Sequence, residues 1–291
     1  MRLPTQSRKL KRSCCINGFA ILLFFMSSCT NLGHIKQFAQ TSTETATFNQ
    51  LVDDYVRYSD RVIRYQSKSQ KEHFEKEKQQ RENQKAGLIA LHQTMTNYMT
   101  ALGALAEDKV VTYDAELDSL AKTLENSKFV KAESVQASGS ISKILFKAYT
   151  GHWRKDKLKE TIVSSNSDFQ KLIKGLKFIV EEGFMNSLNI EMTSADKAFQ
   201  KGMVDFKHRT EEKQTPPAIA LLLEEWKYKK QNSIETKKKM IAHYAKVLDK
   251  VSEGHQNLYD NRDDLSRKEL IEELKKHGKD LKKIYKSIKS L

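Results

Sequence analysis

Histidine and acidic side chains are the residues of this sequence that could bind a metal or transfer protons. A di-iron helical bundle uses Glu-x-x-His pairs on inward helix faces, and none of the eight histidines has a glutamate three residues before it. The nearest match, Asp205-x-x-His208, is typical of a solvated helix turn, as is the charge-rich stretch around His73. The zinc-binding HExxH, the phosphate-binding P-loop, the GxSxG nucleophile turn and the glycine-rich dinucleotide turn do not occur. The sequence therefore predicts no catalytic residue, no metal, no cofactor and no enzyme.

Cys29 is the one residue to which the sequence assigns defined chemistry. It follows an N-terminus with five basic and no acidic residues, and then an uncharged apolar run of 13 residues from Cys14 to Met26. Such a run suits the apolar region of a signal peptide, whereas a membrane-spanning helix needs about 20 residues. The small residues Ser27 and Ser28 precede the cysteine, as signal peptidase recognition requires.

The motif Met26-Ser27-Ser28-Cys29 resembles the lipobox of bacterial lipoprotein signal peptides, with Met26 where that motif usually has leucine. The resemblance implies that residues 1–28 are removed and that Cys29 becomes the acylated, palmitate-type lipid anchor of the mature chain. Two or more acyl chains hold a protein stably on a membrane. Thr30 in place of aspartate favours the outer membrane of a Gram-negative host, with the leaflet left open. The alternatives are an ordinary cleaved signal peptide with an incidental cysteine, or a buried helix.

Composition favours helices in the remainder of the chain. Removal of residues 1–28 takes away five of the 51 basic residues and none of the 37 acidic ones, which leaves a net charge of +9. Three prolines and 11 glycines in 291 residues, with 30% charged residues, indicate long helices with solvated faces. No cysteine follows Cys29, so disulfides are excluded there. We expect an all-α fold, an elongated helical bundle with long coiled-coil-like helices.

The predicted organisation has four parts after the signal peptide. These are a lipidated tether (29–33), a long-helix bundle (34–208), a linker (209–217) and C-terminal helices that pack on the same bundle (218–291). Within the bundle we expect one long helix over 34–106 with a break near Lys68 to Glu72. Further helices are expected over 113–126, 131–150 and from about 152 to 206. In the linker, Thr215 can cap a helix whose first turn holds Pro216 or Pro217.

The C-terminal part shows two helical patterns. A heptad-like seam follows the linker, at Leu223, Trp226, Lys230, Ser233, Lys237, Met240, Tyr244, Val247, Val251 and Leu258. The last helix begins with a predicted capping box of Ser266 and Glu269. It carries nine basic and four acidic residues over 265–291, and the basic residues include Lys275, Lys276, Lys279, Lys282, Lys283, Lys286 and Lys289. These lysines predict a surface for anionic lipid or a partner, unless the helix docks on the bundle and leaves them merely solvated.

The segment Ala86–Ala106 has no charged side chain over 21 residues. One interpretation is a central helix buried by its neighbours, with Gly87 and Gly103 allowing close contacts. The other is a helix that inserts into a membrane or lines a pore, although its polar residues fit hydrocarbon poorly.

The sequence as a whole therefore favours an envelope lipoprotein with a structural or protein-interaction role. The alternative is a membrane-active protein that uses Ala86–Ala106. The predicted partners are the membrane, through the lipid anchor, an envelope protein or a second copy, and anionic lipid. Export excludes nucleic acid as a partner despite the sequence pI of 9.4.

Overall fold

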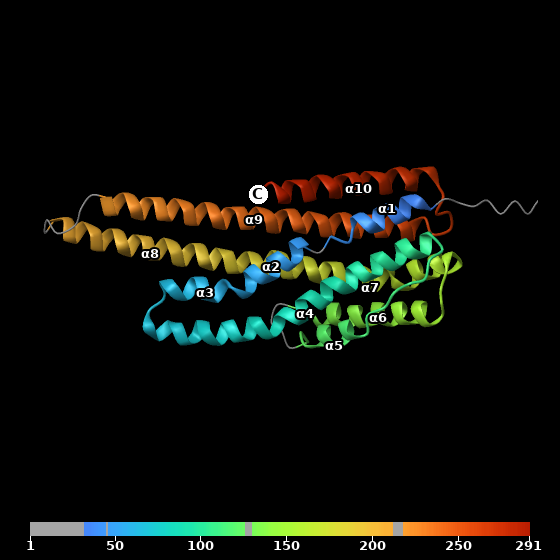
Figure 1. The fold of residues 1–291 in the computed structure, drawn as a ribbon, viewed down its shortest axis with the longest axis horizontal. Coiled ribbons are helices and arrows are strands. Elements are labelled where there is room, and N and C mark those ends of the chain that lie inside the picture. Colours follow the sequence, from blue (N-terminus) through green and yellow to red (C-terminus); the bar gives the residue numbers. More distant parts are fainter. Residues whose placement is uncertain (1–31, 45, 126–129, 212–217) are drawn as a thin grey trace, which may run out of the picture. The chain divides into compact units, whose positions relative to one another are not determined.

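The computed structural model describes residues 32–44, 46–125, 130–211 and 218–291, without the side chains of 209–211 (Figure 1). Within these ranges every regular element is a helix and no strand occurs, which confirms the all-α prediction. The predicted signal peptide and Cys29 lie outside the described residues. Leu32, which the sequence assigns to the tether, is 6% exposed and already belongs to the packed core.

The single long helix expected over residues 34–106 is wrong in its first half. The chain instead forms α1 (Gly33–Thr41), α2 (Ala46–Val56), α3 (Tyr58–Val62), the 3₁₀ turn η1 (Ile63–Tyr65) and α4 (Lys68–Ala106). At the first break, the hydroxyls of Ser42 and Thr43 donate to the carbonyls of Phe38 and Gln40. Such local bonds compete with continued helix.

The predicted break near Lys68 lies just before that residue. Gln66 is extended there, and Ser67 and Gln70 form a capping box at the start of α4.

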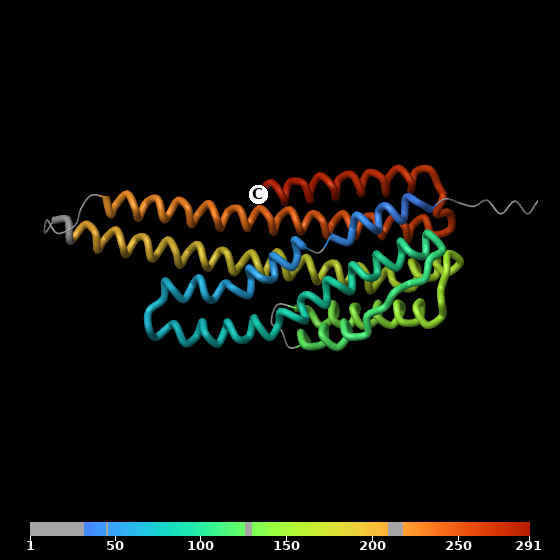
Figure 2. Tube along the Cα trace, in the orientation of Figure 1, coloured from blue at the N-terminus to red at the C-terminus, as the bar shows by residue number. Residues whose placement is uncertain are grey.

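Within the described ranges, eight further helical elements follow α4. They are α5 (Glu116–Lys122), α6 (Ala132–Thr150), the 3₁₀ turn η2 (Lys155–Lys157), α7 (Leu158–Phe178), the π-helix η3 (Ile179–Phe184), α8 (Met185–Glu211), α9 (Ala218–Asp260) and α10 (Lys268–Lys289). Helices α8 and α9 pack against each other as a hairpin (Figure 2). The capping box predicted at Ser266 is wrong, because the Ser266 hydroxyl donates to Asp264 and Arg267 is the N-cap of α10.

The uncharged half of α4 is the centre of the core. Helices α1, α2, α5, α6 and α7 all pack on α4, and most side chains of Ala86–Ala106 are buried. A Cβ on Gly87 would lie 2.6 Å from Leu124, so α5 approaches α4 closely at this glycine. The prediction of a buried central helix is confirmed. Within the described part of the chain, no helix is both long and apolar enough to cross a membrane.

Helix α10 docks on the rest of the unit through its apolar face. Leu270, Leu274 and Leu281 are each at most 1% exposed, and α10 packs on α9 and α1. His34 Nε2 lies 2.9 Å from the carbonyl of Leu265, which ties α1 to the connection between α9 and α10. The docked interpretation of the last helix is thus confirmed.

Two helical glycines provide a matched test of this packing. A Cβ on Gly254 would lie 2.2 Å from the ring of the buried Phe38, whereas a Cβ on Gly278 would meet no atom within 4 Å. We expect Gly254→Ala to lower the free energy of unfolding by about 1–3 kcal/mol through overpacking. Gly278→Ala should raise it by up to about 1 kcal/mol through helix propensity. Urea denaturation of both variants checks this, and equal effects would contradict the close approach of α9 to α1.

Candidate functional site

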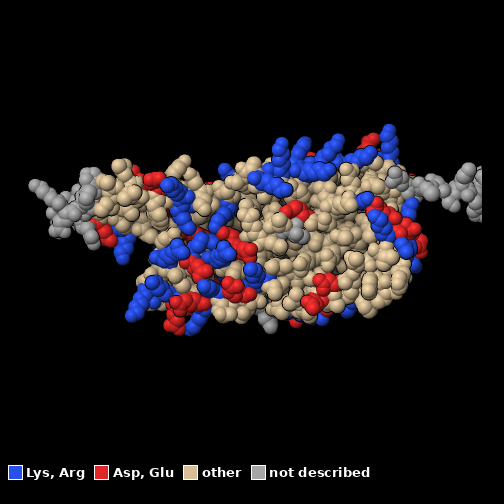
Figure 3. All heavy atoms as spheres, in the orientation of Figure 1, with Lys and Arg blue, Asp and Glu red and all other residues tan. Residues whose placement is uncertain are grey.

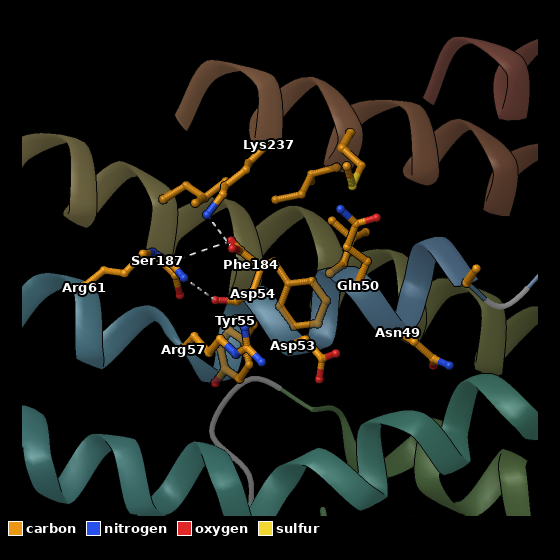
Figure 4. A pocket seen from close by; sticks show the side chains of 15 residues that line it. Asn49, Gln50, Asp53, Asp54, Tyr55, Arg57, Arg61, Phe184, Ser187 and Lys237 are labelled. Carbon is orange, nitrogen blue, oxygen red and sulfur yellow. Dashed lines mark hydrogen bonds and ion pairs between the residues drawn. The ribbon is translucent and has the colours of Figure 1, made fainter. Parts of the chain in front are cut away.

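A cavity of about 460 Å³ opens between α2, α3, the end of η3, α8 and α9. Its buried wall is apolar and includes Leu51, Phe184, Leu188 and Ile241. The remaining wall is polar, with Asp54 at its centre and Arg61 and Lys237 reaching it from α3 and α9 (Figure 4).

Ion pairs connect this polar wall to a buried carboxylate. Arg61 Nη2 lies 3.2 Å from Asp54 Oδ2 and 2.8 Å from Glu191 Oε2. Lys237 Nζ lies 2.5 Å from Asp54 Oδ1, and Lys230 Nζ lies 2.5 Å from Glu191 Oε1. The five residues come from α2, α3, α8 and α9, so the cluster fixes these helices around the cavity.

Glu191 is the most constrained member of the cluster, because its side chain has no exposed surface. Burial raises the pKa of Glu191, but the hydrogen bonds from Arg61 and Lys230 outweigh burial and hold the pKa below its ordinary value. The carboxylate is therefore charged at neutral pH. Its charge can remain buried only because Arg61 and Lys230 pair with it.

A second buried cation supports the same junction from α4. Arg81 is 6% exposed and pairs with Glu77 Oε1 at 2.6 Å. Its guanidinium carbon lies 4.2 Å and 4.0 Å from the ring centroids of Tyr55 and Tyr58. Arg81 Nη1 also donates to the hydroxyl of Ser187, 3.0 Å away, which lines the cavity. Arg81 thereby holds α2, α3 and α8 against α4.

Two histidines lie in the core beside tyrosine hydroxyls. Tyr98 Oη is 2.7 Å from His255 Nε2, and Tyr244 Oη is 2.5 Å from His92 Nε2. Burial lowers the pKa of both histidines from 6.5 to about 3, so both imidazoles are neutral at physiological pH. His255 Nδ1 lies 2.9 Å from Asn166 Oδ1, which fits a tautomer that donates there and accepts from Tyr98. These pairs are enclosed by the core and reach no cavity lining.

A third feature is the exposed apolar surface at the end of the α8–α9 hairpin. The hairpin-tip surface comprises Val204, Ile219, Leu221, Leu222 and Tyr228, which are 40–68% exposed. Near this surface, Lys227 Nζ of α9 lies 4.5 Å from the ring centroid of Phe199 on α8. A Cβ on Gly202 of α8 would lie 3.6 Å from Leu223 of α9. These contacts hold α8 against α9. Exposed large apolar side chains at one end of a long hairpin are candidates for an interaction surface.

The lysines predicted as a lipid or partner surface line the outer face of α10. All seven are exposed, and they form much of the row of basic side chains along α10 in Figure 3. Asp205 and His208 are both exposed on α8, and His73 is exposed on α4. Among the described residues, no group of three His, Cys, Asp or Glu side chains could hold a metal ion.

Comparison with known proteins identifies no relative. No protein-family model, no curated protein and no solved structure shows a significant match to the chain. The function must therefore be argued from the residues and the geometry alone.

No pattern in the sequence predicts the cavity or the ion-pair cluster. Asp54, Arg61 and Glu191 carry no motif, and their pairing joins residues 130 positions apart. The hairpin-tip surface does have a sequence signal, the apolar run Ala218–Leu223 directly after Pro217. Only Leu223 of that run belongs to the predicted seam. On the seam itself, Ser233 is exposed, whereas the neighbouring Ile234 is fully buried.

Glu191 and Glu225 form a matched pair for testing the cluster. Glu191→Gln leaves Arg61 and Lys230 without their buried counter-charge, and we expect it to cost about 3 kcal/mol of stability. Glu225→Gln breaks only an exposed pair with Lys229, and should leave the stability nearly unchanged. Thermal and urea unfolding measure both effects. A Glu191 variant as stable as the Glu225 variant would contradict the structural role of the cluster.

The buried histidines predict acid sensitivity. The unfolded chain binds protons at these histidines below about pH 6.5, whereas the folded chain keeps them neutral down to about pH 3. The folded state therefore loses stability as the pH falls through this window, by about 4 kcal/mol for both histidines between pH 7 and pH 5.

Denaturation curves at several pH values check this slope. The free energy of unfolding should depend less on pH in the double variant His92→Phe and His255→Phe, when each variant is compared with its own value at pH 7. His73→Ala, which changes an exposed histidine, is the control and should retain the wild-type slope. A double variant with an unchanged slope would contradict the assignment.

Proposed function

We propose that this protein is a lipid-anchored helical adaptor of the bacterial cell envelope, with no catalytic activity of its own. The lipobox-like motif supports anchoring through Cys29, and Thr30 favours the outer membrane. The proposal includes an elongated bundle in which α8 and α9 pair in a coiled-coil-like manner. Its role is to hold a recognition surface away from the anchoring membrane.

The observation that carries this proposal is the separation between the N-terminal entry and the hairpin-tip surface. The chain enters the packed unit at Leu32, and α1 is tied through His34 to Leu265, just beyond the end of α9. The hairpin-tip surface lies at the other end of α9, which has 43 residues. At 1.5 Å per residue, the two ends of α9 are about 65 Å apart. The described chain therefore begins near one end of α9 and has its exposed apolar residues near the other, which suits an adaptor.

The occupant that we propose for the hairpin-tip surface is an envelope protein with an apolar groove. Aromatic and large aliphatic side chains form the centres of protein interfaces, and Leu221, Leu222 and Tyr228 are the most exposed of the set. The distance of the surface from the anchor favours a protein over the anchoring membrane. A second copy of the chain is the competing occupant.

The seven lysines of α10 are a second proposed contact, with anionic lipid or with the same partner. These lysines lie on the side of α10 that faces away from its buried apolar residues. They can therefore contact a ligand while α10 stays docked. No observation favours the membrane-inserting alternative, since Ala86–Ala106 would have to leave the core on which five other helices pack.

A photoreactive residue placed at Leu221 in the full chain, expressed in its native envelope, tests the proposal. We expect a discrete crosslinked product that contains one other envelope protein and that disappears when Leu222→Lys is added. The same photoreactive residue at Phe146, which is 50% exposed on α6, is the control and should give no such product.

Two further results would count against the adaptor. A product that contains only a second copy of the chain would replace the partner by self-association. Cys29→Ser should prevent acylation and release the protein from the membrane fraction. Unchanged membrane association of this variant would remove the anchor from the proposal.

A further inference from the structure

The cavity is lined in part by one side of α2. Six of its lining residues recur at spacings of three and four along α2, which places them on one side; they are Ala46, Asn49, Gln50, Asp53, Asp54 and Arg57. The opposite side of α2 carries the buried Phe48 and Val52 and packs on α4. The lining side is mostly polar, so α2 presents hydrogen-bonding groups to the cavity.

The facing wall of the cavity is apolar and buried. Phe184, Leu188 and Ile241 are each 2% exposed, and Leu51, 4% exposed, adds an apolar side chain from α2 itself. Pockets for small molecules typically have volumes of about 300–1,000 Å³, apolar linings and a few placed polar groups. The cavity of about 460 Å³ lies within this volume range, and one of its walls is apolar and buried.

The charges around the cavity favour an anion. Three basic side chains, Arg57, Arg61 and Lys237, and two acidic ones, Asp53 and Asp54, line the cavity. The Lys237 ammonium has three N–H donors, and its hydrogen bond to Asp54 uses one of them. Arg57 is exposed at the rim and forms no ion pair within the described ranges. Lys237 and Arg57 therefore retain donors for a ligand.

The backbone beside the cavity is also unusual. The π-helix Ile179–Phe184 interrupts the otherwise continuous run from α7 to α8, and its last residue, Phe184, lines the cavity. Short π-helical segments occur frequently at functional sites, because the extra residue shifts the direction of the side chains that follow. The π-helix is a second observation, independent of the charges, that supports a functional site at this cavity.

We propose that this cavity binds a single-chain amphiphile with an anionic head group, either a carboxylate or a phosphate monoester. The head group contacts Lys237 and Arg57, and the apolar chain lies against Phe184, Leu188 and Ile241. Arg61 is a positioning residue, since its guanidinium is already held by Asp54 and Glu191. Binding here does not depend on the hairpin-tip surface or on its partner.

Photolabelling of the full chain in phosphatidylcholine nanodiscs tests this proposal. The probe is a decanoate with a photoreactive group at the end of its chain, used below its micelle concentration. We expect mass spectrometry to find the adducts on cavity residues of α8 and α9, such as Leu188 and Met240. Unlabelled decanoate and decyl phosphate should both displace the probe, and their order of potency identifies the preferred head group. Decanol should need a concentration about tenfold higher or more, because it lacks the charge.

Three variants complete the test. Arg57→Gln should weaken labelling about tenfold, and Ala46→Trp should block it by filling the exposed mouth, with an unchanged circular dichroism spectrum in both. Lys282→Gln removes an equal charge from α10, away from the cavity, and should leave labelling unchanged. Labelling spread over the whole chain, equal displacement by decanol, or equal losses in the Arg57 and Lys282 variants would overturn the proposal.

Discussion

Burial of the uncharged half of α4 is the constraint on which the rest of the structure depends. This segment brings hydroxyl and imidazole groups into the core, where each unpaired polar group costs free energy. Some of the helices that pack on it supply polar partners for these groups. Thr94 pairs with Ser138 of α6 at 2.9 Å, and Tyr98 pairs with His255 of α9. Such pairs fix how far each helix is shifted along the axis of α4. Apolar contacts alone would define this shift less strictly.

At the other end of the core, the charged half of α4 contributes a buried charge, which needs partners of opposite charge or aromatic rings. There Arg81 is buried between two tyrosine rings, and Glu191 is buried between two cations. Each buried charge is stable only with its partners in place. Polar contacts therefore join the helices at this junction, in addition to the apolar ones. The cavity lies between these helices, next to the π-helix that ends at Phe184.

The sequence predicted helical structure well wherever a helix has a clear apolar side. The last helix illustrates this, because Leu270, Leu274 and Leu281 lie where their spacing placed them. Prediction failed where local hydrogen bonds compete with the helix, as at Ser42, where two short helices replace one long helix. It also failed at the candidate site, since the contact of Arg61 with Glu191 depends on how α3 and α8 meet. The sequence around either residue contains no pattern that predicts this contact.

The sequence by itself determined the helical class, the absence of cysteine chemistry after Cys29, and the lipoprotein-like N-terminus. These properties depend on residue type and on spacing within a few turns, which are local quantities. Only the tertiary structure decided which charges are buried, which apolar side chains remain exposed, and where a cavity opens. Leu221 and Leu248 have the same side chain on the same helix, yet the first is 68% exposed and the second is fully buried. The difference arises because neighbouring helices cover α9 at Leu248 and leave it uncovered at Leu221, which helix periodicity cannot specify.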